Sequence, residues 1–127
     1  MLEHRHVIIR AKVDHPPQHF ESPFLTNWFY QLVEDLGMKV LLGPYVTYCR
    51  MKGNRGWTGI AAIETSHIAL HIWDEDKPSL LQLDVYTCSS LDLDVVMEAL
   101  HGFGPSDIEY LLLDRKDELK LEGILKT

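Results

Sequence analysis

The sequence predicts an α+β fold, a two-layer sandwich in which two helices cover one face of a mostly antiparallel sheet. Segments rich in β-branched and aromatic residues recur between turn residues, and only two segments have helical periodicity. The order of elements is therefore β-α-β-β-β-β-α-β. Two helices are too few to cover both faces of such a sheet. The chain has 127 residues without an internal repeat or a linker, so we expect a single domain over residues 1–127.

The first two elements have the clearest patterns. Residues 7–13 (VIIRAKV) combine β-branched residues with alternating polar ones, which predicts a strand, and residues 14–22, with two adjacent prolines, indicate a loop. A helix is predicted from Ser22, its expected cap, with Pro23 in its first turn, to a stop at Gly37. Apolar side chains recur along it at every fourth position, namely Phe24, Trp28, Leu32 and Leu36.

The remaining elements are mostly strands. Strand-like stretches are predicted over residues 39–49, 57–64, 66–73, 80–88 and 107–113. Turn residues separate them at 52–56 and 74–79. A second, short helix is predicted between Ser90, its expected cap, and Gly102, and the charged tail from residue 114 has no clear pattern.

Composition indicates a globular protein without nucleic-acid or membrane partners. Hydrophobic residues make up 46% of the chain and charged residues 24%, and no apolar run reaches the ~20 residues that a membrane span needs. The formal charge is −7 and no basic stripe is present, so nucleic acid is not an expected partner, whereas a cationic small molecule would be attracted. Residues 1–6 lack the apolar stretch of a secretion signal, so we expect a cytoplasmic protein.

Ser66, His67 and His71 lie in one strand-like stretch and suggest three kinds of chemistry. The two histidines are four residues apart, which along a strand separates their side chains by roughly 13 Å, too far for one metal ion. No metal site is therefore expected. Ser66 with a histidine as base would suit a serine hydrolase, although the G-x-S-x-G turn is absent. Alternatively, Ser66 Oγ would attack the carbonyl of Thr65 and cut the backbone, with a histidine as base and a hydroxyl as donor.

The order and spacing of further residues resemble a known family. The segments that carry the resemblance are residues 56–59 (GWTG), 64–67 (ETSH), 71–75 (HIWDE) and 84–88 (DVYTC). In the small S-adenosylmethionine decarboxylases of bacteria and archaea the corresponding pattern is approximately G-x-S-G, E-S-H-x-x-x-H-T-W-P-E and V-D-V-F-T-C-G. The chain therefore resembles this pyruvoyl-dependent, self-processing family, and the resemblance implies the same α+β sandwich.

The resemblance implies catalytic roles for four residues. After a cut between Thr65 and Ser66, Ser66 would become a pyruvoyl group, a carbonyl cofactor that binds the substrate amine and accepts the electrons left by departing carbon dioxide. His71 would be the base for this processing. Thr58 would assist it in place of a family serine, and Cys88 would return a proton to the substrate.

The resemblance also implies the substrate and the assembly. The substrate would be S-adenosylmethionine, and its decarboxylation would serve polyamine (spermidine) synthesis. Trp73 would supply an aromatic face near the adenine and the sulfonium, and Glu75 would accept hydrogen bonds from the ribose hydroxyls. The protein would be a homodimer with active sites near the subunit interface.

Three departures from the family pattern keep two alternatives open. Thr65 replaces a glutamate, Asp74 replaces a proline, and the cationic segment Arg50–Lys52 replaces an aromatic residue. One alternative is an uncut, non-catalytic relative that acts as a binding or regulatory protein. The other is a pyruvoyl-dependent decarboxylase of another amino acid, such as ornithine or arginine.

Overall fold

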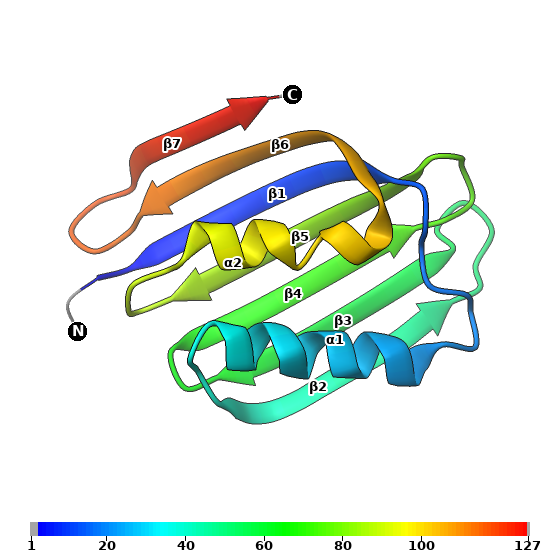
Figure 1. Ribbon diagram of the computed structural model, residues 1–127, viewed down its shortest axis with the longest axis horizontal. Helices are drawn as coiled ribbons and strands as arrows, with labels where there is room; N and C mark the ends of the chain where they lie inside the picture. The colour runs from blue at the N-terminus through cyan, green and yellow to red at the C-terminus, as the bar shows by residue number, and fades with distance from the viewer. Residues whose placement is uncertain (1–2, 127) are drawn as a thin grey trace.

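The computed structural model describes residues 3–126 as one sheet with two helices packed on one of its faces (Figure 1). The elements are β1 (Arg5–Val13), α1 (Ser22–Asp35), β2 (Val40–Cys49), β3 (Gly56–Ile63), β4 (Ser66–Trp73), β5 (Ser79–Thr87), α2 (Leu93–Glu98), the 3-10 helix η1 (His101–Phe103), β6 (Pro105–Asp114) and β7 (Lys120–Lys126). The strands lie in the order β2-β3-β4-β5-β1-β6-β7, and all neighbours pair antiparallel. The predicted α+β sandwich is confirmed, with a sheet that is wholly antiparallel.

The structure differs from the sequence prediction at the helix starts and in the tail. Asp92, not Ser90, caps α2, because its carboxylate accepts hydrogen bonds from the backbone N–H groups of Asp94 and Val95. Ser22 is the first helical residue of α1 rather than its cap. The tail forms β7, which pairs with β6 and adds an edge strand to the sheet. Its pattern is obscured in the sequence because charged residues are common on edge strands.

The hydrophobic core lies between the sheet and the two helices. Alternate side chains of each central strand point toward the helices and are buried, as the two-residue period of a strand requires. The largest fully buried side chains are Phe29, Phe103, Ile9, Leu25, Leu32, Ile63, Ile68, Leu70, Ile72, Leu81, Leu83 and Leu100. This packing holds the central strands in a fixed register, and so fixes the positions of the side chains on the other face.

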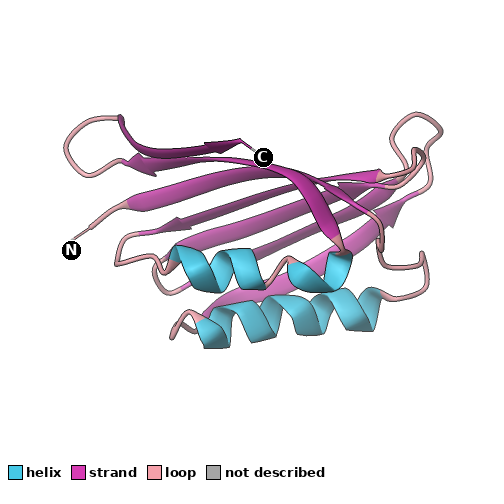
Figure 2. Cartoon of the chain, turned by 45° about the horizontal axis from the view of Figure 1, so that its top comes forward, coloured by secondary structure: helices cyan, strands magenta, loops and turns pink. Residues whose placement is uncertain are grey.

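The other face of the sheet carries no helix, and we call it the open face (Figure 2). In β4 it bears His67, Ala69, His71 and Trp73, which alternate with buried residues. One row of cross-strand partners on this face is largely apolar and runs through Ile60, Ala69, Asp84, Ile8, Leu111 and Ile124. The exposed members of this row are Ile8, Ile60, Leu111 and Ile124. A hollow of about 510 Å³ lies over this row and over the neighbouring row that contains His71.

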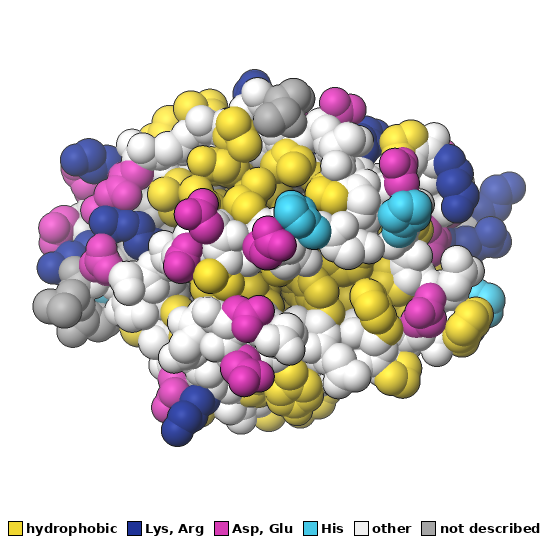
Figure 3. Space-filling view, viewed as in Figure 1, with side chains coloured by type: hydrophobic (Ala, Val, Ile, Leu, Met, Phe, Trp, Pro, Cys, Tyr) yellow, Lys and Arg dark blue, Asp and Glu magenta, His cyan; other side chains and the backbone are white. Residues whose placement is uncertain are grey.

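The helix side of the molecule carries several acidic side chains. A groove between α1 and α2 is lined partly by Trp28, Val95 and Ala99, and Asp35, Asp94 and Glu98 also line it. Acidic side chains stand along both helices on this face (Figure 3). Within residues 3–126, neither helix has the length and apolar character needed to cross a membrane.

Candidate active site

Thr58 and His71 face each other on the open face, across β3 and β4. They are direct cross-strand partners, and Thr58 Oγ1 lies 3.1 Å from His71 Nδ1. The imidazole of His71 also stacks on the indole of Trp73, with ring centroids 5.6 Å apart and planes inclined by 23°. The structure thus brings three predicted site residues together as a hydroxyl, an imidazole and an aromatic face.

The close approach of β3 and β4 beside this group depends on Gly56. Its φ of 150° is a conformation that glycine adopts readily and other residues avoid. A Cβ atom at this position would overlap the carbonyl oxygen of Ile72. A side chain there would therefore push the start of β3 away from β4, and Thr58 would move relative to His71.

Ser66 lies at the other end of β4, directly after the turn that joins it to β3. It pairs with Ile63 and with the buried Thr87, and its φ of 146° is rare for a residue with a side chain. The carbonyl oxygen of Thr65 accepts a hydrogen bond of 2.7 Å from the backbone N–H of Cys88. The peptide bond before Ser66 is therefore adjacent to a strained backbone and has a polarised carbonyl group.

Ser66 and His71 do not lie together within one chain. Five residues along a strand separate them by roughly 16 Å at ~3.3 Å per residue. Cys88 lies at the Ser66 end, because it follows Thr87, the pairing partner of Ser66. The predicted catalytic residues therefore form two groups on one chain: Thr65, Ser66 and Cys88 at the turn, and Thr58 with His71 farther along the hairpin.

Glu75 holds the loop between β2 and β3. Its carboxylate oxygens accept hydrogen bonds from the backbone N–H groups of Arg55, at 2.9 Å, and Gly53, at 3.0 Å. These two bonds, that of Arg55 first, hold the pKa of Glu75 below its ordinary value of 4.5. Trp73 Nε1 donates a hydrogen bond of 2.8 Å to Asn54 Oδ1 in the same loop. Both predicted substrate-binding residues are therefore tied to this loop.

Tyr48 is an aromatic neighbour that the sequence did not single out. Its hydroxyl donates to the carboxylate of Asp74, with oxygen–oxygen distances of 2.9 and 3.0 Å. Burial, followed by this hydrogen bond, raises the pKa of Tyr48 above its ordinary value of 10.0, so the phenol remains a donor. The Arg50 guanidinium lies 5.6 Å from the centre of the Tyr48 ring. Asp74, which stands where the family has a proline, thus has a local hydrogen-bonding partner. The only sign of Tyr48 in the sequence was an aromatic residue at an alternating strand position.

Acid is expected to release the loop that Glu75 holds. A carboxylate whose pKa is lowered by folding stabilises the folded loop above pH 4.5, and this contribution is lost as the pH falls through the lower folded-state pKa. Protection of the Gly53 and Arg55 amides from hydrogen exchange, corrected for the intrinsic pH dependence, should therefore fall across this range. In Glu75→Gln the protection should be weak and independent of pH. Equal protection of the wild-type amides on both sides of the transition would contradict this role for Glu75.

Comparisons with known proteins agree with the fold. Residues 5–116 match the family model described as S-adenosylmethionine decarboxylase. An S-adenosylmethionine decarboxylase proenzyme of Archaeoglobus fulgidus is 32% identical over 88 residues, which cover 66% of this chain and 75% of that protein. The crystal structure of the adenosylmethionine decarboxylase from Aquifex aeolicus superposes with a TM-score of 0.65 at 19% identity, over 91% of this chain and 95% of that one.

The fold and these matches define the class of protein as a decarboxylase-like lyase. More particularly, the chain belongs to the S-adenosylmethionine decarboxylase family, whose model covers most of its length.

Proposed function

We propose that this protein decarboxylates S-adenosylmethionine with a pyruvoyl group made from its own Ser66, and that the product serves polyamine (spermidine) synthesis. The observation that carries the proposal is the geometry of the peptide bond between Thr65 and Ser66. The φ of Ser66 is 146°, and the carbonyl oxygen of Thr65 is held at 2.7 Å by the backbone N–H of Cys88. This bond is the one at which the family resemblance implies a cut.

The proposed self-cleavage uses the groups at this bond. Ser66 Oγ attacks the carbonyl carbon of Thr65, the hydroxyl proton passes to a base, and the peptide nitrogen leaves the carbon, so that the amide becomes an ester. Removal of the Ser66 α-proton then breaks the bond between Cβ and the ester oxygen. This step releases residues 1–65 with a free carboxylate and leaves dehydroalanine at position 66. Water adds to the imine form of this residue and ammonia departs, which leaves a ketone.

The residues of the two groups supply the assistance that these steps require. The backbone N–H of Cys88 stabilises the negative charge that develops on the Thr65 oxygen, because it is already directed at that atom. The strained φ of Ser66 favours the reaction, since cutting the chain relieves it. His71 is the base, and the Thr58 hydroxyl, at 3.1 Å from Nδ1, fixes the orientation of the imidazole.

Decarboxylation uses the remaining predicted residues. A pyruvoyl group at position 66 supplies a carbonyl that binds the substrate amine and takes up the electrons released with carbon dioxide. The Cys88 thiol, at the same end of the sheet, returns a proton to the substrate α-carbon. Trp73 offers a face to the adenine and the cationic sulfonium, and Glu75 an acceptor to the ribose. Each oxygen of Glu75 has a second lone pair beyond the one used by the loop.

A homodimer accounts for the separation of Ser66 and His71. The open face exposes a row of apolar side chains that nothing covers in the described chain, and a second copy of the same face is a natural occupant. The family resemblance implies active sites near such an interface. His71 of one subunit would then serve Ser66 of the other, because within one chain roughly 16 Å separates them.

Two measurements on the purified protein test the proposed function. Intact-mass analysis should find residues 1–65 and 66–127 as separate species, whose masses add up to that of the chain plus water minus ammonia. Ordinary proteolysis at the same bond would add water only. The cut protein should release labelled carbon dioxide from S-adenosylmethionine labelled in its carboxyl group. A single full-length species that releases no carbon dioxide would refute the proposal and favour the uncut binding protein.

A second candidate substrate class is favoured by the loop between β2 and β3. Arg50 lies over Tyr48, and both oxygens of Glu75 already bind backbone N–H groups. A partly occupied ribose acceptor suits a smaller amino acid that has no ribose, such as ornithine or arginine. The same carbon dioxide assay with these two amino acids separates the two candidates.

A further inference from the structure

We propose that His6, His67 and Asp84 form a binding site for a divalent transition-metal ion, for which Zn²⁺ is the best fit. These side chains play no part in the processing and decarboxylation described above. The spacing of His67 and His71 along one strand excludes a metal between those two residues. The sheet supplies different partners for His67, from strands that are remote in the sequence.

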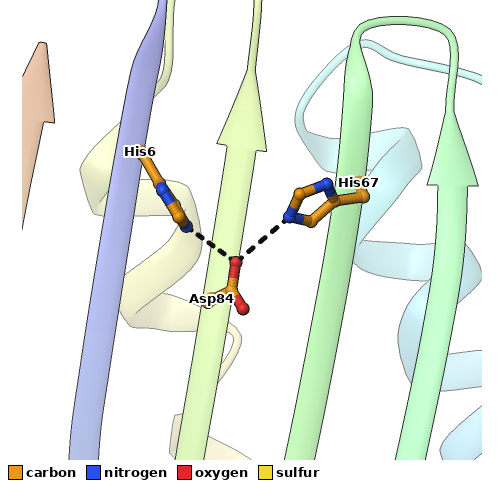
Figure 4. A group of neighbouring side chains, drawn as sticks. All are labelled: His6, His67 and Asp84. Atoms are coloured by element: carbon orange, nitrogen blue, oxygen red, sulfur yellow. Dashed lines mark hydrogen bonds and ion pairs between the residues drawn. The ribbon is translucent and has the colours of Figure 1, made fainter. Parts of the chain in front are cut away.

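Three neighbouring strands supply one ligand each. His6 on β1 and His67 on β4 are both cross-strand partners of Tyr86 on β5, so they flank it on the open face. Asp84 lies two residues from Tyr86 on the same face of β5, and its carboxylate points between the two imidazoles (Figure 4). Strands held in register by backbone hydrogen bonds fix such a group more precisely than loops would.

The distances fit a metal with little movement. His67 Nε2 lies 3.4 Å and His6 Nε2 lies 2.7 Å from the same oxygen, Asp84 Oδ1, and the three ligand atoms lie within 4.8 Å of one another. Bonds of about 2.0–2.2 Å in a tetrahedral zinc site place the ligand atoms ~3.4 Å apart. The His67 pair already has this spacing, and the His6 pair has to open slightly. Two imidazoles and one carboxylate leave a fourth position for water, which is a common zinc donor set.

The ligands have the charge that a cation requires. Asp84 contributes a carboxylate, whose Oδ1 already lies 2.7 Å from His6 Nε2 and 3.4 Å from His67 Nε2, and the two imidazoles contribute nitrogen donors, which is a donor set that Zn²⁺ accepts. The His67 side chain is half exposed, that of Asp84 is partly exposed and that of His6 is mostly buried, so solvent reaches the site from the side of His67 and Asp84.

Arg115 opposes the metal and provides a sharp test of it. Its Nη1 lies 3.2 Å from Nδ1 of His6, so without a metal the imidazole proton is on Nε2 and is donated to Asp84. A metal on Nε2 moves this proton to Nδ1, and Arg115 must then give up its contact. Arg115 would keep its other contact, which is with the Tyr86 ring, because its guanidinium carbon lies 4.1 Å from the centre of that ring.

A metal here would join the two pieces of a cut chain. On the proposed function, His6 belongs to the piece 1–65, whereas His67 and Asp84 belong to the piece 66–127. His67 also directly follows Ser66, so the ion would fix the start of β4 after the backbone is cut. We therefore assign the ion a stabilising role in the processed protein. Binding itself does not depend on processing and can be measured in uncut Ser66→Ala.

The test is a titration with ZnCl₂ of chelator-treated full-length protein, by calorimetry, in both the wild type and Ser66→Ala. A single saturable site is expected in each, and Co²⁺ in its place should give the intense visible bands of a tetrahedral ion. Saturating Zn²⁺ should raise the melting temperature of the cut wild type. No saturable binding in either protein would overturn the site. Binding in Ser66→Ala with an uncut wild type would refute self-cleavage but not the metal site.

Variants assign the ligands. His6→Gln, His67→Gln and Asp84→Asn should each weaken zinc binding at least about tenfold. His101→Gln is the matched control, because His101 is an exposed histidine 3.3 Å from the carboxylate of Glu98, and it should bind zinc as the wild type does. Arg115→Met should bind zinc more tightly, since it removes the competing donor and a positive charge. Unchanged binding in His67→Gln, or weaker binding in Arg115→Met, would overturn the assignment.

Discussion

Replacing Ser66 with alanine should leave the chain whole and reduce carbon dioxide release to the uncatalysed background. Alanine has no oxygen to attack the carbonyl of Thr65, so neither the ester nor the ketone can form. The substrate amine would then find no electrophile, and the residues proposed to hold or protonate the substrate, such as Cys88, cannot replace one. The loss should be complete rather than partial, because no other serine follows a strained, polarised peptide bond of this kind in the described part of the chain.

Intact mass and labelled carbon dioxide measure the two consequences on one sample. Ser106→Ala is a suitable control, since Ser106 is an exposed residue of β6, far along the chain from the hairpin, and this variant should be cut as the wild type is. Circular dichroism of the uncut Ser66→Ala protein should show the cooperative melting of a folded domain. Cleavage that persists in folded Ser66→Ala would assign the cut to a contaminating protease.

Much of the fold can be predicted because its core follows strict alternation. In β4 every second residue is apolar, and Ile68, Leu70 and Ile72 are all buried against the helices. β7 could not be predicted in this way. Only Gly123 and Leu125 in it are partly buried, so the edge strand has no apolar period to detect. The cap of α2 was misplaced by two residues because Ser90 and Asp92 are both good caps in a sequence, and only the helix position selects Asp92.

The site is predictable along a strand and less so across strands. Residue order placed Thr58, His71 and Trp73 on neighbouring strands, and antiparallel pairing then brought Thr58 Oγ1 within 3.1 Å of His71. The hydrogen bond from Cys88 to Thr65 could not be foreseen, because it depends on backbone geometry at two remote strand ends. The same holds for His6 and Asp84, which are 78 positions apart and meet only through the strand order of the sheet.

Two inactive variants should restore processing when they are combined. On the proposed function, Ser66→Ala lacks the nucleophile and His71→Ala lacks the processing base, so each should stay uncut when produced alone. If His71 serves Ser66 of the other subunit, a mixed dimer contains one complete pair, an intact Ser66 on the His71→Ala chain and an intact His71 on the Ser66→Ala chain. The two-fold symmetry of such an assembly makes the two sites equivalent in the wild-type dimer, so one complete site is expected per mixed dimer.

The measurement is co-expression of the two variants with distinguishable tags, followed by intact mass. Random pairing places about half of the His71→Ala chains in mixed dimers, so about half of them should be cut, whereas no Ser66→Ala chain should be. The control is co-expression of Ser66→Ala with His101→Gln, which keeps both Ser66 and His71. Every partner in this mixture carries an intact His71, so every His101→Gln chain should be cut. Cleavage of His71→Ala alone would show that another base suffices. If both variants stay uncut after co-expression, His71 acts within its own subunit. The hairpin would then have to leave its strand geometry to close the roughly 16 Å between positions 66 and 71.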